Sequence, residues 1–465
     1  MAAVGQGEVV KRNAPDKKPR TAILKGLFAP VDAASVVFFR VSFGLLMIWH
    51  FREYFLADKV HVFTRTNILF KFYGFEWVRP GPEWAMRMVF WLLAAASLGI
   101  ALGLLYRLSA IVFFSLNVYV LLLDIALINN HDYLIALFGF LLIFVPAHRH
   151  GSLDATLKPK IRSPTVPAWA LWLLRFQVGV PYFFGALAKL NGDWMLRAQP
   201  MTLWLETGGA GGDLLPDFMR GPRAGYFFSW SGFLLDLLIV PCLLYRRTRL
   251  AAYLVIVTFH CINSYIFDIG VFPWLMICAT AIFFPPGWPR RVGLAAKRAA
   301  PRKRQGKPPE ELDRRQRLTV ALLGAYVALQ VLLPFRHLLY PGNVDWTEEG
   351  IYFAWRMKLR DKRGDMHLVL LDRKTRKATV YRDFDKVLTP RQHLHIVHDP
   401  DMLLQFVHHV ARLLHEKGED DFEIRAVTNI SFNGREPQPI VDPNVDLAAQ
   451  RRGLGAASWM MPLKD

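Results

Sequence analysis

Residues 84–127 read WAMRMVFWLLAAASLGIALGLLY, then Arg107, then LSAIVFFSLNVYVLLLDIAL, so a single arginine separates two long apolar runs. A membrane-spanning helix needs about 20 mostly apolar residues, and each run meets that length. This stretch therefore predicts two membrane-crossing helices joined by a short basic turn. Further apolar runs of similar character follow or precede it: 34–57, 132–146, 167–190, 225–245, 250–270, 271–287 and 318–339. The sequence thus predicts a polytopic α-helical membrane bundle of about nine spans.

The composition fits this fold class. Of 465 residues, 53% are hydrophobic and 13% aromatic, and the hydrophobic residues are gathered in blocks. The net charge of +19 does not indicate nucleic-acid binding, because the basic residues lie between the apolar runs instead of on one soluble face. The three cysteines lie inside apolar runs without metal-ligand spacing, so we expect neither a disulfide nor a metal site.

The distribution of lysine and arginine predicts the orientation, since short cytoplasmic loops carry the excess of both. The tail 1–33, Arg107, and the loops 147–166, 246–249 and 288–317 are rich in basic residues, whereas the alternate connections carry few. We therefore expect a basic cytoplasmic tail over 1–33, which continues directly into the first span. A transmembrane domain follows over 34–340, and the remainder of the chain lies on the extracytoplasmic side.

Residues 341–465 have the composition of a small soluble α+β domain. Alternating hydrophobicity predicts a hairpin over 366–383 and a strand over 422–432. Between them, residues 400–418 place apolar side chains on one helical face, with Asp399 as candidate N-cap and Gly418 as the stop.

Three histidines lie just before that helix, in HLHIVHDP: His393, His395 and His398. No recognisable ligand pattern of Asp, Glu or Cys accompanies them. We expect them to be exposed strand and loop residues.

Lys189 ends the fifth apolar run in YFFGALAKLNGDW, at the predicted outer boundary of the membrane. Gly185 lies one helical turn before it and Tyr182 two turns before it. A small residue one turn away leaves room for a ligand or for a close helix. An interfacial lysine that reaches for lipid headgroups is the common alternative explanation.

Two histidines lie in other spans. His260 is followed by Asn263 and Ser264 at i+3 and i+4, so the three share a helical face, where interhelical hydrogen bonding would also explain them. Asn130 and His131 lie at the start of the fourth run. Asn129, Asn130 or Asp132 could cap that helix, so His131 is the informative residue of this segment.

The predicted topology brings these positions to one depth. Lys189, His131 and His260 belong to different spans, and each falls at or near the outer half of the membrane. Ionisable groups within spans are costly and are candidates for function. A lysine removed from water there would serve as a base near neutral pH, and a hydrophobic acidic substrate dissolved in the bilayer would suit it. Asp124 and Asp236 also fall in spans, without a partner that the sequence identifies.

Several segments carry a resemblance to a known family. They are DAASVVFFRVSFGLLM, ALGLLYRLS, INNHDYL, YFFGALAKLNGDW, FHCINSYIFDIGVFP, LPFRHLLYPGNVDWTEEGIYFAWRM and VDPNVDL. Jointly they resemble the vitamin K-dependent γ-glutamyl carboxylase family, whose membrane part is the horizontally transferred transmembrane (HTTM) domain. The resemblance runs through almost the whole chain.

The resemblance implies an activity. Lys189 looks like the catalytic lysine that deprotonates reduced vitamin K, the hydroquinone, so that it reacts with O2. The oxygenated product removes a γ-proton from a glutamate side chain, which then adds CO2, and vitamin K epoxide is left. His131 and His260 would orient the oxygenated quinone by hydrogen bonds.

The resemblance also implies binding residues and partners. Substrate or quinone binding would fall to Asn130, Tyr182, Gly185, Asn263 and Ser264. The partners would be the lipid bilayer, a glutamate-containing peptide or protein, and a quinone reductase for recycling, with no nucleic acid and no metal.

The sequence departs from the animal enzymes of the family in identifiable places. Ala188 replaces the first lysine of a pair, Ile128 replaces a tryptophan, and no cysteine can form their disulfide. These differences indicate a bacterial inner membrane with a periplasmic soluble domain; the endoplasmic reticulum would give the equivalent topology.

Two alternative functions remain open at this stage. One is a quinol epoxidase, or a membrane-modifying enzyme, that does not carboxylate glutamate. The other is a non-catalytic membrane binding or transport protein in which Lys189 is a substrate counter-ion. The absence of repeat symmetry in the sequence argues against the second.

Overall fold

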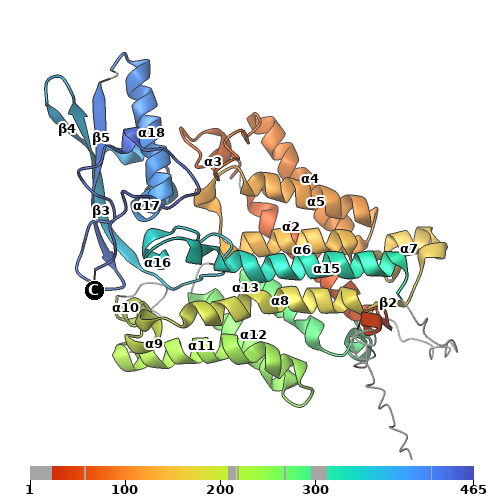
Figure 1. Ribbon diagram of the computed structural model, residues 1–465. Helices are drawn as coiled ribbons and strands as arrows, with labels where there is room; N and C mark the ends of the chain where they lie inside the picture. Colours follow the sequence, from red (N-terminus) through yellow and green to blue (C-terminus); the bar gives the residue numbers. More distant parts are fainter. Residues whose placement is uncertain are drawn as a thin grey trace, which may run out of the picture.

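A computed structural model describes residues 24–464 except 57–58, 208–215, 217–218, 267–268, 295–311 and 420. It consists of a helical bundle with a small sheet-containing domain at one end (Figure 1). The long helices of the bundle are α2 (Ala34–Leu56), α4 (Glu83–Leu102), α5 (Tyr106–Leu121), α6 (Asn130–Phe144), α8 (Ala168–Lys189), α11 (Pro222–Leu244), α12 (Arg249–Ile266), α13 (Phe272–Thr280) and α15 (Arg314–Leu332).

Each predicted apolar run coincides with one of these helices. Among the described residues, five helices are long and apolar enough to cross a membrane: Ala34–Leu56, Glu83–Leu102, Ala168–Lys189, Pro222–Leu244 and Arg314–Leu339. Shorter apolar helices cover Tyr106–Leu121, Asn130–Phe144 and Phe272–Phe283. The membrane-bundle prediction is thus supported by five helices, and a total of nine spans stays a prediction.

Short elements connect the long helices. They are β1 (Pro30–Asp32), α3 (His61–Thr64), η1 (Ile125–Leu127), η2 (Ala147–Arg149), α7 (Leu153–Leu157), η3 (Pro159–Ile161), β2 (Thr165–Pro167), α9 (Gly192–Leu196), α10 (Met201–Glu206), η6 (Ala281–Phe283), α14 (Trp288–Arg291), η7 (Leu333–Leu339) and α16 (Val344–Thr347). The strands β1 and β2 pair antiparallel. In Figure 1, β2 and α7 lie at the end of the bundle opposite the soluble domain.

The soluble domain contains a three-stranded antiparallel sheet in the order β4-β3-β5. Its elements are β3 (Lys362–Asp372), β4 (Ala378–Tyr381), η8 (Phe384–Lys386), α17 (Pro390–His398), α18 (Pro400–Glu416), β5 (Phe422–Phe432) and η9 (Leu447–Ala449). The predicted hairpin, strand and helix are confirmed. Asp399 Oδ1 accepts a hydrogen bond from the Met402 amide at 3.1 Å, and Gly418 follows the helix with φ +78°.

The expectation for the three histidines is wrong, because His393, His395 and His398 lie on helix α17 and are only partly exposed. The helix begins with a capping box. Thr389 Oγ1 accepts from the Gln392 amide at 3.3 Å, and Gln392 Oε1 accepts from the Thr389 amide at 3.1 Å.

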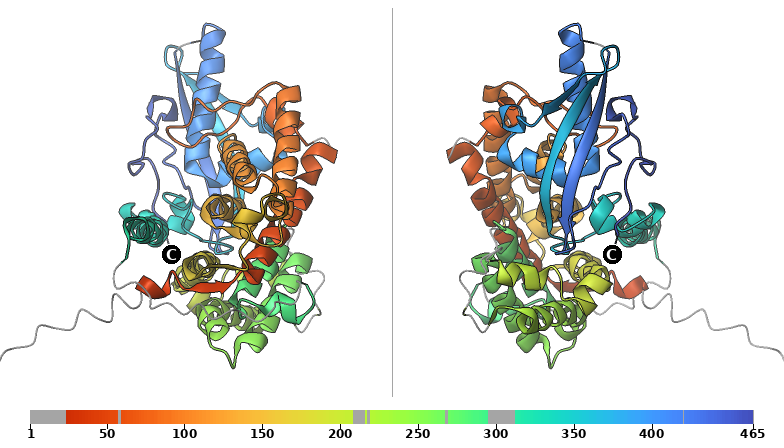
Figure 2. Two further views of the ribbon diagram at one scale, coloured as in Figure 1. Left: turned by 90° about the vertical axis from the view of Figure 1, so that its right-hand side faces the viewer. Right: turned by 90° about the vertical axis from the view of Figure 1, so that its left-hand side faces the viewer.

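The soluble domain docks on the bundle through polar contacts. Gln392 donates to Asp124 Oδ2 at 2.9 Å, and Arg391 donates to the Ala126 carbonyl at 2.8 Å. On the other side of the interface, Arg435 Nη2 lies 2.7 Å from Asp193 Oδ1. Figure 2 views the bundle nearly end-on, with α11 and α12 on one side and α4 and α5 on another.

Close helix packing in the bundle depends on glycine at one crossing. A methyl group at Gly44 of α2 would lie 2.7 Å from the Ala101 backbone nitrogen of α4, whereas one at Gly324 of α15 would meet no atom within 4 Å. We expect Gly44→Ala to lower the free energy of unfolding by about 1–3 kcal/mol, because backbone must move. Gly324→Ala should be neutral or stabilising. Thermal unfolding in detergent compares the two, and equal effects would contradict this packing.

Candidate active site

One large cavity, of about 1540 Å³, lies where the bundle meets the soluble domain. Its inner wall comes from helices α2, α6, α8, α11, α12 and α13, and its outer wall from residues 348–362 and helix α17. Apolar groups from α11 and α12 line one side: Phe228, Leu235, Leu254, Val255, Phe259 and Ile262. Leu254 and Val255 are about half exposed.

Lys189 is the last residue of α8 and lines this cavity. Its Nζ lies 2.6 Å from Asp236 Oδ2 on α11 and donates to the Gly185 carbonyl at 3.4 Å. The ammonium also lies 5.3 Å from the centre of the Trp194 ring. Only 9% of Lys189 is exposed. The lysine is therefore held inside the protein by an ion pair, and it does not reach out towards headgroups.

Gly185 makes this pair possible. A methyl group at position 185 would lie 2.9 Å from Asp236 Oδ2. The glycine is not among the residues that line the cavity. The small residue thus leaves room for a close helix and its carboxylate, which was one of the two possibilities drawn from the sequence.

Tyr182 and His260 form a second polar pair in the cavity wall. The Tyr182 hydroxyl lies 3.0 Å from His260 Nε2, and both side chains are buried. His260 Nδ1 is buried and has no hydrogen-bond partner among the described residues. Asn263 and Ser264, from the next turn of α12, also line the cavity. A buried ring nitrogen without a partner is costly, and this cost makes His260 a candidate for a functional role.

His131 and Asn130 lie across the cavity, at the start of α6. The amide of Asn129 donates to Asp132 Oδ2 at 2.9 Å, so the cap is made by these two residues. The Phe272 ring lies 6.0 Å from the His131 ring and 5.8 Å from the His260 ring, and so separates the two histidines.

A third histidine, His50 of α2, belongs to the same wall. It was not among the candidate residues predicted from the sequence. Its Nε2 lies 3.6 Å from Asp132 Oδ1, and His131 Nε2 lies 3.6 Å from the same oxygen. The signal was present, because His50 is an ionisable residue inside the first apolar run.

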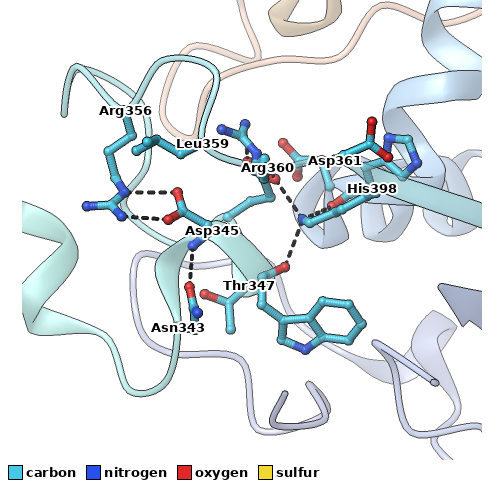
Figure 3. Close-up of polar contacts among 12 residues, drawn as sticks. Asn343, Asp345, Thr347, Arg356, Leu359, Arg360, Asp361 and His398 are labelled. Atoms are coloured by element: carbon cyan, nitrogen blue, oxygen red, sulfur yellow. Dashed lines mark hydrogen bonds and ion pairs between the residues drawn. The ribbon is translucent and has the colours of Figure 1, made fainter. Parts of the chain in front are cut away.

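The outer wall carries a network of charges (Figure 3). Asp345 accepts from Arg356 Nε at 2.9 Å. Glu348 accepts from Arg360 at 2.6 Å and from Lys362 at 2.7 Å. The cationic residues of this wall outnumber its carboxylates even when Asp345 behind it is counted: Arg356, Lys358, Arg360, Lys362 and Arg391 against Asp345, Glu348 and Asp399. This wall therefore suits an anionic ligand.

Comparison with known families shows what the chain is related to. The HTTM domain family matches residues 28–288, and the family described as vitamin K-dependent gamma-carboxylase, lumenal domain, matches residues 315–465. The chain belongs to the vitamin K-dependent gamma-carboxylase family. The cavity lies between the two matched regions, and residues of both line it. A search of solved structures finds no match.

The titratable groups of the soluble face are perturbed by burial. Burial lowers the pKa of His395 to about 4 and that of His398 to about 3, so both rings are neutral at pH 7. Burial raises the pKa of Asp399 to about 6. Among the described residues, no group of three or more His, Cys, Asp or Glu side chains is arranged to hold a metal ion.

The close approach of α11 to Gly185 can be tested by comparing substitutions at Gly185 and at Gly179, which lies on the same helix. Gly185→Ala places a methyl against the Asp236 carboxylate, whereas a methyl at Gly179 would make an ordinary contact, 3.6 Å from Val240. We expect Gly185→Ala to lower the free energy of unfolding by about 1–3 kcal/mol. Gly179→Ala should be neutral or stabilising, since alanine favours helix. Thermal unfolding measures both, and a neutral Gly185→Ala would contradict the close α8–α11 contact.

Asp399 gives a pH dependence with a defined sign. Its pKa is raised from 3.8 to about 6, so the folded protein binds this proton more tightly than the unfolded chain. The resulting stability is full below pH about 4 and is lost as the pH rises to about 6. Asp399→Asn keeps an oxygen acceptor for the Met402 amide, and its Nδ2 can donate to the Tyr352 hydroxyl, which donates to Oδ2 in the wild type. The substitution should remove a pH-dependent change in stability of up to about 3 kcal/mol.

Thermal unfolding between pH 4 and 7 provides the measurement. Asp365→Asn, at an exposed position of β3, is the control and should keep the slope of the wild type. Identical slopes in wild type and Asp399→Asn would show that the buried carboxyl does not titrate in this range.

Proposed function

We propose that the protein carboxylates glutamate side chains of a peptide or protein at the γ-carbon, with reduced vitamin K as the co-substrate that O2 converts to the epoxide. The family supports a carboxylase-related function. The observation that carries the specific proposal is the meeting of Lys189, the Tyr182–His260 pair and His131 in one cavity, opposite a cationic wall.

The cavity fits a lipid quinol by size and by chemistry. Ligand pockets for small molecules occupy about 300–1,000 Å³, and about 1540 Å³ leaves room for a glutamate side chain as well. Lys189 and the unpartnered His260 Nδ1 offer polar contacts for the oxygens of a quinol ring. The apolar residues of α11 and α12 offer a surface for its hydrocarbon tail.

When bound, reduced vitamin K supplies the electrons for O2 and, once oxygenated, the strong base that removes a γ-proton of glutamate. The chain supplies the surroundings. Lys189 is the base for an acidic hydroxyl in the cavity. Tyr182 fixes the orientation of the His260 ring through the 3.0 Å contact, so that Nδ1 is held ready to donate or accept a hydrogen bond.

The outer wall would take the second substrate. A glutamate carboxylate is anionic, and guanidinium groups donate charge-assisted hydrogen bonds to carboxylates. Asp345 and Glu348 hold Arg356 and Arg360 through Nε and Nη2, which fixes both guanidinium groups before a ligand arrives. The cationic wall thus supports binding of a glutamate-containing peptide from the soluble side.

We further propose a bacterial inner-membrane location with a cytoplasmic N-terminus and a periplasmic soluble domain. Basic residues of the 147–166 loop lie near α7 and β2, at the end of the bundle away from the sheet (Figure 1). A quinone reductase in the same membrane would regenerate the reduced co-substrate.

The test is an assay of purified protein in lipid with reduced vitamin K, O2, labelled bicarbonate and a glutamate-containing peptide. We expect both epoxide and labelled peptide from wild type, and a loss of about 100-fold or more in both with Lys189→Ala, because the base is removed. Lys71→Ala is the control. This partly buried lysine lies outside the cavity lining, so activity should remain.

The other outcomes have defined meanings. Epoxide without labelled peptide would make the protein a quinol epoxidase with another acceptor. Neither product, across several quinols and peptides, would favour a non-catalytic binding or transport protein.

A further inference from the structure

The partner of Lys189 has no role in the proposed function so far. Asp236 lies in the middle of α11, with 8% of the residue exposed, and among the described residues it is the ionic partner of Lys189. A carboxylate inside a membrane span is costly unless it is paired, and it is a candidate for function by that cost. The pair is also positioned at the cavity wall, since both residues line it.

Three contacts bring the end of α8 against α11. Gly185 allows the approach of the Asp236 carboxylate, as described above. Trp194, five residues beyond Lys189, donates from Nε1 to the Ser229 carbonyl of α11 at 2.7 Å. The lysine amine is therefore held between the carboxylate at 2.6 Å and the indole ring at 5.3 Å. Its position is set by α11 as much as by its own helix.

The charges explain what such a partner does. Lys189 can accept a proton only as the neutral amine, and the pair then carries one buried negative charge, that of Asp236. When the amine accepts a proton from an acidic hydroxyl in the cavity, the ammonium neutralises the carboxylate, and the negative charge passes to the deprotonated ligand. With or without the carboxylate, the transfer creates one ammonium and one ligand anion. Only with Asp236 does the new ammonium form 2.6 Å from a carboxylate that stabilises it in apolar surroundings.

We propose that Asp236 is a positioning residue for Lys189: it fixes the amine at the cavity wall and stabilises the ammonium that forms when the lysine accepts a proton. The proposal rests on Lys189 acting as the base of the proposed function. The contact of Asp236 with Lys189 is direct, and Asp236 acts through the lysine.

The first measurement needs no substrate. Lys189 is labelled with an amine-reactive reagent in the substrate-free protein, and the rate is followed by mass spectrometry. We expect Asp236→Asn to raise the labelling rate of Lys189 at least about tenfold, because a buried ammonium without its counter-charge is unfavourable. Asp236→Glu keeps the charge and should stay near the wild-type rate.

The second measurement is epoxide formation with reduced vitamin K. We expect Asp236→Asn to lower kcat about 100-fold and to change KM for the quinol by less than about threefold, since the carboxylate acts on proton transfer. Asp236→Glu should recover part of kcat. In a Lys189→Ala background, Asp236→Asn should cause no further loss, because both changes remove one function.

Asp32→Asn is the matched control. Asp32 forms a partly buried ion pair with Arg290, 3.0 Å apart, outside the residues that line the cavity. Asp32→Asn breaks this pair and so measures the general effect of losing a partly buried ion pair. We expect its kcat to equal that of the wild type. If Asp236→Asn does not fold, Asp236→Ala takes its place, since it also removes the carboxylate: a lowered kcat with unchanged KM supports the proposal, and wild-type kcat overturns it.

The outcomes separate the two proposals. Wild-type labelling and wild-type kcat in Asp236→Asn would overturn the positioning role, while epoxide formation that depends on Lys189 would leave the proposed function intact. No epoxide from the wild type with any quinol would refute the function, and the labelling rate would still report whether Asp236 controls the lysine.

Discussion

Arg435 of the soluble domain and Asp193 of the bundle make the contact on which the cavity depends. Two hydrogen bonds, of 2.7 and 2.9 Å, join them, and Asn433 donates to the same carboxylate at 2.9 Å. About a tenth of each side chain of the ion pair is exposed, so water cannot replace a lost partner. Because Asp193 follows Lys189 by four residues, the soluble domain fixes the loop at the end of α8. Each part of the molecule supplies one wall, and neither part forms the cavity alone.

Hydrogen bonds from the soluble domain also fix the opposite side of the cavity. Arg391 donates to the carbonyl of Ala126 at 2.8 Å, and Gln392 donates to Asp124 at 2.9 Å. These contacts hold the segment that leads into α6, where His131 lies. Helix α17 therefore does two things at once, since its Arg391 docks the domain and its His395 faces the cavity.

Hydrophobic pattern alone predicted much of the fold. Apolar runs located the helices, and period-two alternation located β3 and β5. This works because the spacing of apolar residues along the chain reflects which face of a helix or strand is buried. The partner of Lys189 could not be found in this way, since hydropathy does not say which helices are neighbours in a bundle. The histidines of α17 were placed wrongly for a different reason. The sequence TPRQ at 389–392 is a capping box with proline at the first helical position, a local signal that outweighs the polar composition of the segment.

The location of the buried charges argues for chemistry at the cavity. A buried ion pair adds little net stability, because desolvation of both ions offsets their attraction, and a hydrophobic pair of similar volume often does as well. Lys189–Asp236, Arg360–Glu348 and Lys362–Glu348 are nonetheless gathered around one cavity, in its membrane wall and its soluble wall. Two further largely buried pairs, Arg435–Asp193 and Arg290–Asp32, lie outside the cavity lining and join distant parts of the fold. The proposed reaction, which moves a proton at the membrane wall and holds a carboxylate at the soluble wall, would use the charges at the cavity in both places.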